Sequence, residues 1–145
     1  MPMPQPPPRT PPRKRKTCGR YNDPGHAHAL TFSCFRGQTF LNRDRTRQWM
    51  LDAIEATRAK HAVHIWAYVI MPEHVHLLIY PTQDYSISRI LSSLKQPASK
   101  RAINYIRQHA PAFLEHMTDQ QPNGKGSVRF WQRGGGFDRN LTSAR

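Results

Sequence analysis

The sequence predicts an α+β domain, a ferredoxin-like sandwich in which helices pack on one face of an antiparallel sheet. Segments with the two-residue alternation of strands and segments with helical spacing of apolar residues follow in the order strand, helix, strand, strand, helix. Only Met71-Pro72-Glu73 separates the two middle strands, so they form a hairpin. The 145 residues, of which 37% are hydrophobic, suffice for one domain with an ordinary core.

The first three strands and the first helix are expected from periodicity. Apolar and small residues alternate over 27–35, which predicts a half-buried strand. A helix follows over 43–60, where apolar positions recur on one helical face. Residues 63–70 and 74–80 then form the second and third strands.

The second half of the chain is punctuated by proline and glycine. A helix begins near Ser86, whose hydroxyl can cap it. Pro97 is expected to kink or interrupt this helix, and Pro111 to end it. Residues 120–127 read as a loop, and residues 129–141 as a basic, aromatic and glycine-rich segment that can add a short strand.

The amino-terminal segment differs from the rest in composition. Residues 1–21 are rich in proline and are expected to form an extended basic arm before a domain over 22–145. The arm carries a run of cations, Arg13, Lys14, Arg15 and Lys16. These can contact phosphate, or they can remain part of a solvated tail.

The charge balance favours a polyanionic partner. Lys and Arg number 22 against nine Asp and Glu, for a net charge of +13. Nucleic acid is the first candidate and an anionic membrane surface the second. No apolar run reaches the length of a membrane span or a secretion signal, so a cytoplasmic protein is expected. Cys18 and Cys34 are expected to be free thiols.

Further candidate DNA contacts lie on the second helix and in the last segment. They are Lys95, Lys100, Arg101, Arg129, Arg133 and Arg139. Each can face a phosphate backbone or be an ordinary solvated charge. Trp131 can stack on an unpaired base or pack in the core.

The strongest chemical signal is the pair His74 and His76 at the start of the third strand. Strand side chains alternate, so the two imidazoles share a face and can hold one cation. Imidazoles alone would suit zinc equally well. The spacing recurs at His26 and His28, where sharing a face with apolar residues favours packing or a supporting role over ligation.

The stretch from Trp66 to Ile79, which contains Met-Pro-Glu-His-Val-His-Leu-Leu, resembles the signature of HUH single-tyrosine transposases, and in particular that of the REP-associated tyrosine transposases. Glu73 stands where that family usually has asparagine. The resemblance covers roughly residues 20–141. It extends to Gly25-His26-Ala27-His28, Leu30-Thr31-Phe32-Ser33, Ser93-Leu94-Lys95 and Phe130-Trp131-Gln132.

The resemblance implies a metal-dependent cut in single-stranded DNA beside a short hairpin. In the family, two histidines and a third polar ligand hold Mg²⁺ or Mn²⁺ against the scissile phosphate, and a tyrosine attacks to leave a 5′-phosphotyrosyl enzyme. It further implies a homodimer in the bacterial cytoplasm, associated with the nucleoid. The family's usual carboxy-terminal helical segment is not expected beyond Arg145.

The expected nucleophile is missing. By alignment with the family, the tyrosine position falls on Phe137, immediately before Asp138. Three readings remain open: Tyr105 serves as a substitute nucleophile, the chain is an impaired or domesticated DNA-binding protein, or the metal site directs water at the phosphate. The family's third ligand falls on Asn140 or its neighbour Leu141, which cannot ligate, and Asp138 is the other nearby oxygen donor.

Overall fold

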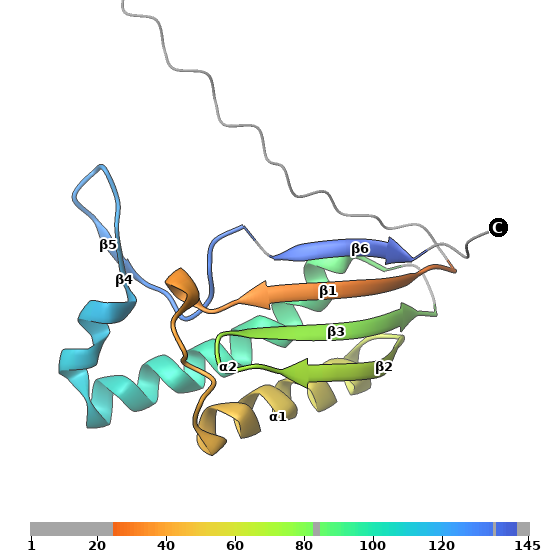
Figure 1. Cartoon of the computed structure of the whole chain (residues 1–145), viewed down its shortest axis with the longest axis horizontal. Helices are drawn as coiled ribbons and strands as arrows, with labels where there is room; N and C mark the ends of the chain where they lie inside the picture. Colours follow the sequence, from red (N-terminus) through yellow and green to blue (C-terminus); the bar gives the residue numbers. More distant parts are fainter. Residues whose placement is uncertain (1–24, 83–84, 135, 142–145) are drawn as a thin grey trace, which may run out of the picture.

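A four-stranded antiparallel sheet with two helices on one face forms the body of the structure, a computed structural model that describes residues 25–82, 85–134 and 136–141. The strand order is β2-β3-β1-β6. The strands are β1 (Ala27–Ser33), β2 (Val63–Ile70), β3 (His74–Pro81) and β6 (Phe137–Leu141). Helices α1 (Asp44–Lys60) and α2 (Ile87–His109) lie behind the sheet in Figure 1 and leave its other face open. This arrangement confirms the predicted α+β sandwich.

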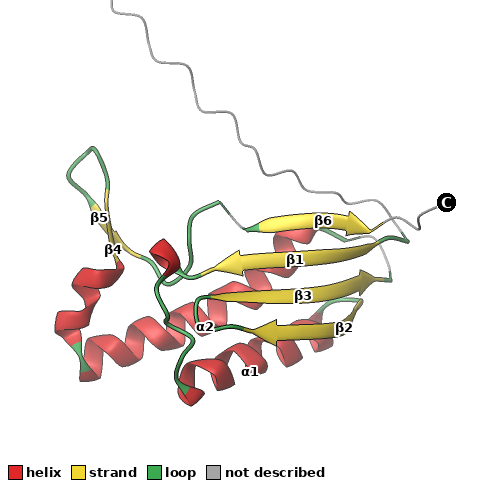
Figure 2. Ribbon diagram, viewed as in Figure 1, coloured by secondary structure: helices red, strands yellow, loops and turns green. Residues whose placement is uncertain are grey.

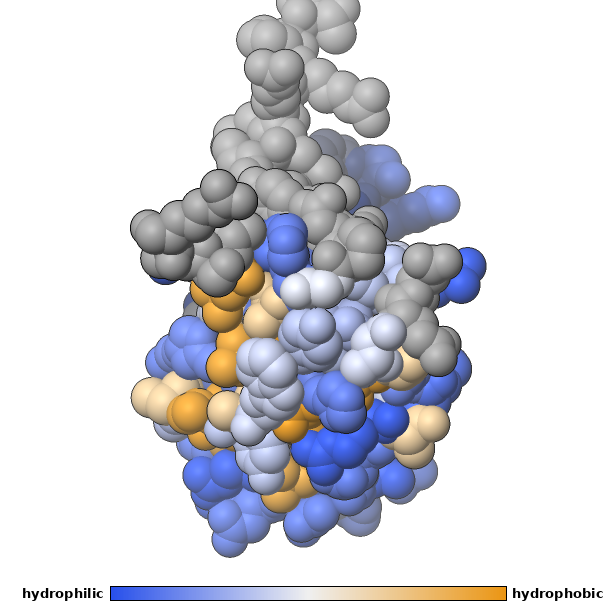
Figure 3. Space-filling view, turned by 90° about the vertical axis from the view of Figure 1, so that its right-hand side faces the viewer, coloured by the Kyte–Doolittle hydropathy of each residue, from blue (hydrophilic) through white to orange (hydrophobic). Residues whose placement is uncertain are grey.

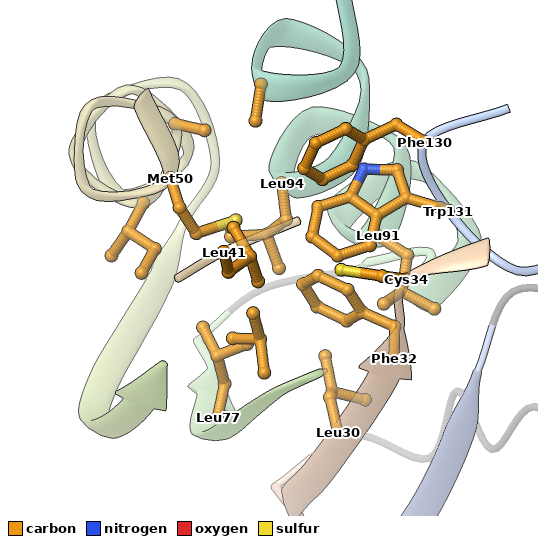
Figure 4. Packing of buried hydrophobic residues seen from close by; sticks show 14 of the residues in the cluster. Leu30, Phe32, Cys34, Leu41, Met50, Leu77, Leu91, Leu94, Phe130 and Trp131 are labelled. Atoms are coloured by element: carbon orange, nitrogen blue, oxygen red, sulfur yellow. The ribbon is translucent and has the colours of Figure 1, made fainter. Parts of the chain in front are cut away.

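The core lies between the sheet and the two helices, because alternate strand residues point to the helical side. Leu30 and Phe32 of β1 are each 1% exposed, and Val75, Leu77 and Ile79 of β3 are also buried. Figure 4 shows Leu30, Phe32 and Leu77 gathered with Met50 of α1 and Leu94 of α2. Burial of each such side chain contributes roughly 1.5–3 kcal/mol.

The end of the sheet at which β3 begins is closed by the chain around Cys34. The first strand ends at Ser33, earlier than predicted, and Cys34 forms an isolated bridge with Trp131. The next residues turn into a short 3-10 helix, η1 (Phe35–Gly37). Burial raises the pKa of the Cys34 thiol to about 12, so this cysteine is an inert part of the core.

Helix α2 is continuous through Pro97. It runs from Ile87 to His109, so of the two effects expected of Pro97, a kink or an interruption, the interruption does not occur. A proline costs a helix interior roughly 3 kcal/mol. The buried stripe that includes Leu94 and Ala98 on either side of Pro97 offsets this cost by packing against the sheet.

The segment after α2 is also more ordered than predicted. A 3-10 helix, η2 (Pro111–Met117), leads into β4 (Thr118–Gln120), which pairs with β5 (Gly126–Val128). The expected loop over 120–127 is therefore the turn and part of a small two-stranded ribbon. Figure 2 shows this ribbon standing away from the main sheet.

Among the described residues, no helix is long and apolar enough to cross a membrane. The end of the molecule where β3 terminates, which faces the viewer in Figure 3, is mostly hydrophilic with small hydrophobic patches. The predicted arm over 1–21, with Arg13, Lys14, Arg15 and Lys16, and also Cys18, lies outside the described residues.

Candidate functional site

His74 and His76 lie at the start of β3 on the open face of the sheet. Their neighbour Val75 is fully buried, so strand alternation turns both imidazoles away from the core. The two Nε2 atoms are 2.8 Å apart, and the rings stand at 88° to one another. The two imidazoles thus point their Nε2 atoms toward each other.

The far edge of each ring is held by an oxygen. The Glu73 carboxylate lies 2.9 Å from Nδ1 of His74. The Thr31 hydroxyl lies 2.9 Å from Nδ1 of His76, because Thr31 of β1 is the cross-strand partner of His76. With both Nδ1 atoms engaged, the two Nε2 atoms are directed toward each other. This is the arrangement that usually fixes histidine ligands of a metal.

The donor set fits a divalent cation. Nitrogen atoms 2.8 Å apart can both reach one ion at the roughly 2.1 Å of a metal–imidazole bond. Over 25–82, 85–134 and 136–141, however, no group of three or more His, Cys, Asp or Glu side chains could hold a metal. Glu73 contacts the opposite edge of His74, so His74 and His76 would offer two nitrogen ligands to a cation.

Phe137, the predicted nucleophile position, lies on the same face as the histidines. It is the first residue of β6 and the cross-strand partner of Thr31, whose other partner is His76. Two strand spacings of about 4.8 Å thus separate the backbones of Phe137 and His76. The phenyl ring is 59% exposed.

Gly136 sets the entry into β6. Its φ is +77°, and a Cβ there would collide with the carbonyl oxygen of Thr31. The chain can approach β1 this closely only with glycine. As a result, β6 pairs with β1 from its first residue, and residue 137 faces the open side.

Asp138 and Asn140 face the helical side of the sheet, not the histidine pair. Asp138 is the cross-strand partner of Leu30 and is 4% exposed, and its Oδ1 lies 3.0 Å from Nδ1 of His28. The Asn140 amide donates to Nδ1 of His26 at 3.0 Å. The structure therefore does not bring either predicted oxygen ligand to His74 and His76, and Leu141 lies on the open face.

His28 is the centre of a buried polar network. It is 0% exposed, with Asp138 at Nδ1 and the Tyr85 hydroxyl 2.7 Å from Nε2. The network joins β1, β6 and the segment before α2. His28 is thus packed inside the protein, which is the packing alternative, and both His26 and His28 contact β6.

Tyr105 lies in the helical layer. Its ring contacts Trp49 of α1 at a centroid distance of 5.9 Å, and the Arg45 guanidinium lies 4.1 Å from its centroid. These residues line a cavity of about 960 Å³ between the two helices and η2. The structure does not bring Tyr105 together with the histidine pair, because the sheet separates them.

The predicted DNA-contact residues divide among three places. Arg139 of β6 is exposed on the open face, and Arg133 is exposed in the segment before β6. Arg129 pairs with Asp119 at 2.8 Å at the base of the ribbon. The rest of the set, Lys95, Lys100 and Arg101, lies on α2.

Arg101 and Trp131, like Arg129, have partners within the protein. Arg101 pairs with Asp52 at 2.7 Å, and the Gln48 amide and this guanidinium lower the pKa of the Asp52 carboxyl. Trp131 packs in the core at 7% exposed and donates to the Lys95 carbonyl at 2.8 Å, which is the packing alternative for this residue.

The open face also carries aromatic residues that sequence reasoning missed. Trp66 of β2 is 55% exposed and stacks on Tyr80 of β3, with centroids 5.1 Å apart and planes 8° apart. Thr31, which orients His76, was missed as well. Alternation in 27–35 puts Thr31 opposite Leu30 and Phe32, but only the strand pairing reveals its partner.

Comparison with known proteins relates the chain to a family of transposases. The sequence pattern described as "Transposase IS200 like" matches residues 24–134. Among curated proteins, none matches the chain. The fold is similar to that of a REP-associated tyrosine transposase bound to a REP hairpin, with a TM-score of 0.52 and 18% identity. That match covers 87% of this chain and 62% of the other, so this chain spans less than two thirds of that protein.

A second solved structure gives a similar result. It is that of a protein assigned as a transposase from Deinococcus radiodurans R1, with a TM-score of 0.51 and 21% identity, over 87% of this chain and 85% of the other. At these identities the two structures support the fold, whereas the family pattern spans well over half of the sequence. The chain belongs to the IS200-like transposase family.

Proposed function

We propose that this protein binds single-stranded or hairpin DNA on the open face of the sheet, with His74 and His76 holding Mg²⁺ or Mn²⁺ against a phosphate. The convergence of the two Nε2 atoms at 2.8 Å, with each Nδ1 held by an oxygen, carries this proposal. When bound, such a cation polarises a phosphoryl oxygen and stabilises charge on the leaving oxygen. Phosphate oxygens and water would supply the remaining ligands, which suits these oxygen-preferring ions.

The surroundings of the pair support an unpaired strand as the ligand. Trp66 and Tyr80 present a stacked aromatic surface on the same face, and Phe137 presents another. Stacking of a base on such a side chain contributes about 1–3 kcal/mol. Arg139 adds a cation on that face for the phosphate backbone.

The ancestral reaction of this site is cleavage and rejoining through a phosphotyrosine, and we infer that the present chain is impaired in it. Residue 137 faces the histidine side of the sheet, but phenylalanine has no hydroxyl with which to attack phosphorus. The present protein is then a DNA-binding protein with a retained metal site. The expected homodimer and association with the nucleoid belong to this proposal and can be checked by sedimentation and by fractionation.

The substitution Phe137→Tyr tests the assignment of the nucleophile position. With Mn²⁺ and a labelled hairpin that carries an unpaired flank, we expect a covalent protein–DNA adduct that survives denaturing electrophoresis. Phe113→Tyr is the matched control, because Phe113 is also exposed but lies on η2. No adduct is expected with this control or with the unchanged protein.

The histidines have a separate test. Addition of His74→Ala and His76→Ala to Phe137→Tyr should abolish the adduct and the binding of Mn²⁺ measured by calorimetry. Hairpin binding at low salt should largely remain, because phosphate neutralisation carries that affinity. Failure of the unchanged protein to bind any hairpin or single strand would refute the proposed function. An adduct that persists without the histidines would refute only their role.

A further inference from the structure

The ribbon β4–β5 is a separate projection with a firm base. Within the part of the chain that the structure describes, its strands pair only with each other, and Figure 1 shows it extending away from the body. At the base, Met117 is fully buried, and the Arg129 amide donates to its carbonyl at 2.7 Å. The Arg129 guanidinium also donates to Asp119 at 2.8 Å. The ribbon is thus anchored where it leaves the core.

The turn at the tip is held by hydrogen bonds of its own. The Gln121 amide donates to the Lys125 carbonyl and the Gly124 amide to the Gln121 carbonyl, both at 3.0 Å. The Lys125 amide donates to Oδ1 of Asn123 at 3.1 Å. Gly124 has φ of +77°, which glycine adopts without strain, and Pro122 restricts the turn further. A tip fixed in this way loses little conformational entropy on binding.

The chemistry of the tip is that of hydrogen bonding. Gln120, Asn123 and Lys125 are exposed, and Gln121 is half-buried. None of the exposed large hydrophobic side chains among the described residues lies on the ribbon. Protein interfaces are usually anchored by buried aromatic or arginine side chains, which this tip lacks. Amide and lysine side chains instead match base edges, with Gln or Asn on adenine and Lys on guanine.

A two-stranded ribbon is a kind of element that a duplex groove can accept. The major groove of B-DNA is about 12 Å wide and admits a two-stranded ribbon. The net charge of +13 brings polyanions to the protein, whereas the ribbon itself contributes few charges. In such an arrangement the cations elsewhere on the protein provide affinity for the phosphate backbone, and the amides at the tip distinguish one base pair from another.

The ribbon leaves the body at the histidine end of the sheet. The Phe35 amide donates to the Phe130 carbonyl, and the Gln132 amide to the carbonyl of Ser33, each at 2.8 Å. Ser33 is in turn the cross-strand partner of His74. A few residues of ordered backbone therefore connect the base of the ribbon to the metal-binding pair.

From this placement we propose that the β4–β5 ribbon enters the major groove of a DNA hairpin stem and so directs the adjoining unpaired strand to His74 and His76. This inference rests on the proposed function, since it assumes that the histidine face receives the unpaired strand. It adds a sequence-reading element that makes recognition depend on the base pairs of the stem.

The test compares two probes and two double variants of the full chain. One probe is a stem-loop with an unpaired flank, whose stem is selected by the unchanged protein from a randomised pool; the other is the flank alone. Gln120→Ala with Lys125→Ala should weaken binding to the stem-loop by about tenfold or more and leave binding to the flank unchanged. Gln108→Ala with Lys60→Ala removes the same exposed groups from the helices and should change neither affinity.

A modified stem tests the groove directly. Replacement of the stem purines by their 7-deaza analogues removes the N7 acceptors of the major groove and should weaken binding by the unchanged protein. It should have no further effect on the ribbon variant. Equal stem-loop binding by ribbon and control variants, or indifference of the unchanged protein to 7-deaza purines, would overturn the ribbon proposal alone. Failure of the unchanged protein to bind either probe would overturn the proposed function with it.

Discussion

The imidazole of His76 is positioned by a residue on another strand. The Thr31 hydroxyl lies 2.9 Å from Nδ1 of His76, on the ring edge opposite the convergent nitrogen. A hydroxyl in this position selects the orientation of the ring before any ligand arrives. Pre-orientation of this kind lowers the cost of binding a cation.

Thr31→Val should therefore weaken Mn²⁺ binding by roughly tenfold or more, because loss of such an outer contact typically costs 10- to 100-fold in metal affinity. Valine has the shape of threonine and suits a strand, so the unfolding transition should hardly move. Calorimetric titration with Mn²⁺ in the absence of DNA measures the effect. Ser33→Ala, which removes a hydroxyl from the same strand and face but not one bonded to either ring, is the control. Equal affinities in the two variants would contradict the role of Thr31.

The role of a single residue could be predicted from sequence only where its partner lies close by in the chain. His74 and His76 are two residues apart on one predicted strand, so their shared face follows from alternation alone. Thr31 and His76 are 45 residues apart, and only the pairing of β1 with β3 brings them together. Asp138 and Phe137 could have been assigned to opposite faces, but the glycines before them left the start of the expected short strand undefined.

At the level of elements, strand β6 depends on a buried polar anchor. Asp138 and His28 meet at 3.0 Å with both side chains fully buried, and Tyr85 occupies the other ring nitrogen of His28. A buried donor or acceptor without a partner costs about 1–3 kcal/mol. The anchor thus fixes the register that places residue 137 on the open face.

Asp138→Leu should lower the free energy of unfolding by roughly 2–3 kcal/mol, because His28 would be left buried without its carboxylate partner. Asp138→Asn should cost less, since the amide oxygen can still accept from Nδ1. Urea denaturation of both variants measures the difference. If the two substitutions destabilise the protein equally, the contact with His28 is not what holds β6.

The remaining elements show which signals a sequence carries. The strands over 63–70 and 74–80 were placed nearly to the residue because both alternation and the short turn were present. Helix α2 continues through Pro97 because tertiary packing outweighs the helix-breaking cost of proline. A rule based on local sequence does not include that packing. The three-residue strands β4 and β5 are too short to show alternation.

The molecule as a whole has two unlike faces. The helical layer covers one face of the sheet, and the open face carries the histidine pair, Arg139 and several aromatic side chains. A net charge of +13 acts over the entire surface and draws phosphate toward it. Affinity for DNA should then come mainly from counterion release, with the open face determining where the strand lies.

Binding of a single strand should weaken steeply with salt. A protein that makes 6–10 phosphate contacts loses about 10³- to 10⁵-fold in affinity between roughly 50 and 200 mM salt. Arg139→Gln should reduce the slope of log K against log salt by about 1. Lys60→Gln, at the end of α1, should leave it unchanged. Fluorescence anisotropy over a salt series measures both slopes, and a flat response would contradict an electrostatic origin of the affinity.

Phe137 is exposed and Gly136 next to it is required by the backbone, so the fold depends on residue 136 and hardly on the side chain at 137. The ring contributes little to the core at 59% exposed, while Gly136 cannot gain a side chain without striking the backbone of β1. Substitution of residue 137 should therefore leave the core intact, so that under the proposed function Phe137→Tyr would add an attacking hydroxyl to the open face without a cost in folding.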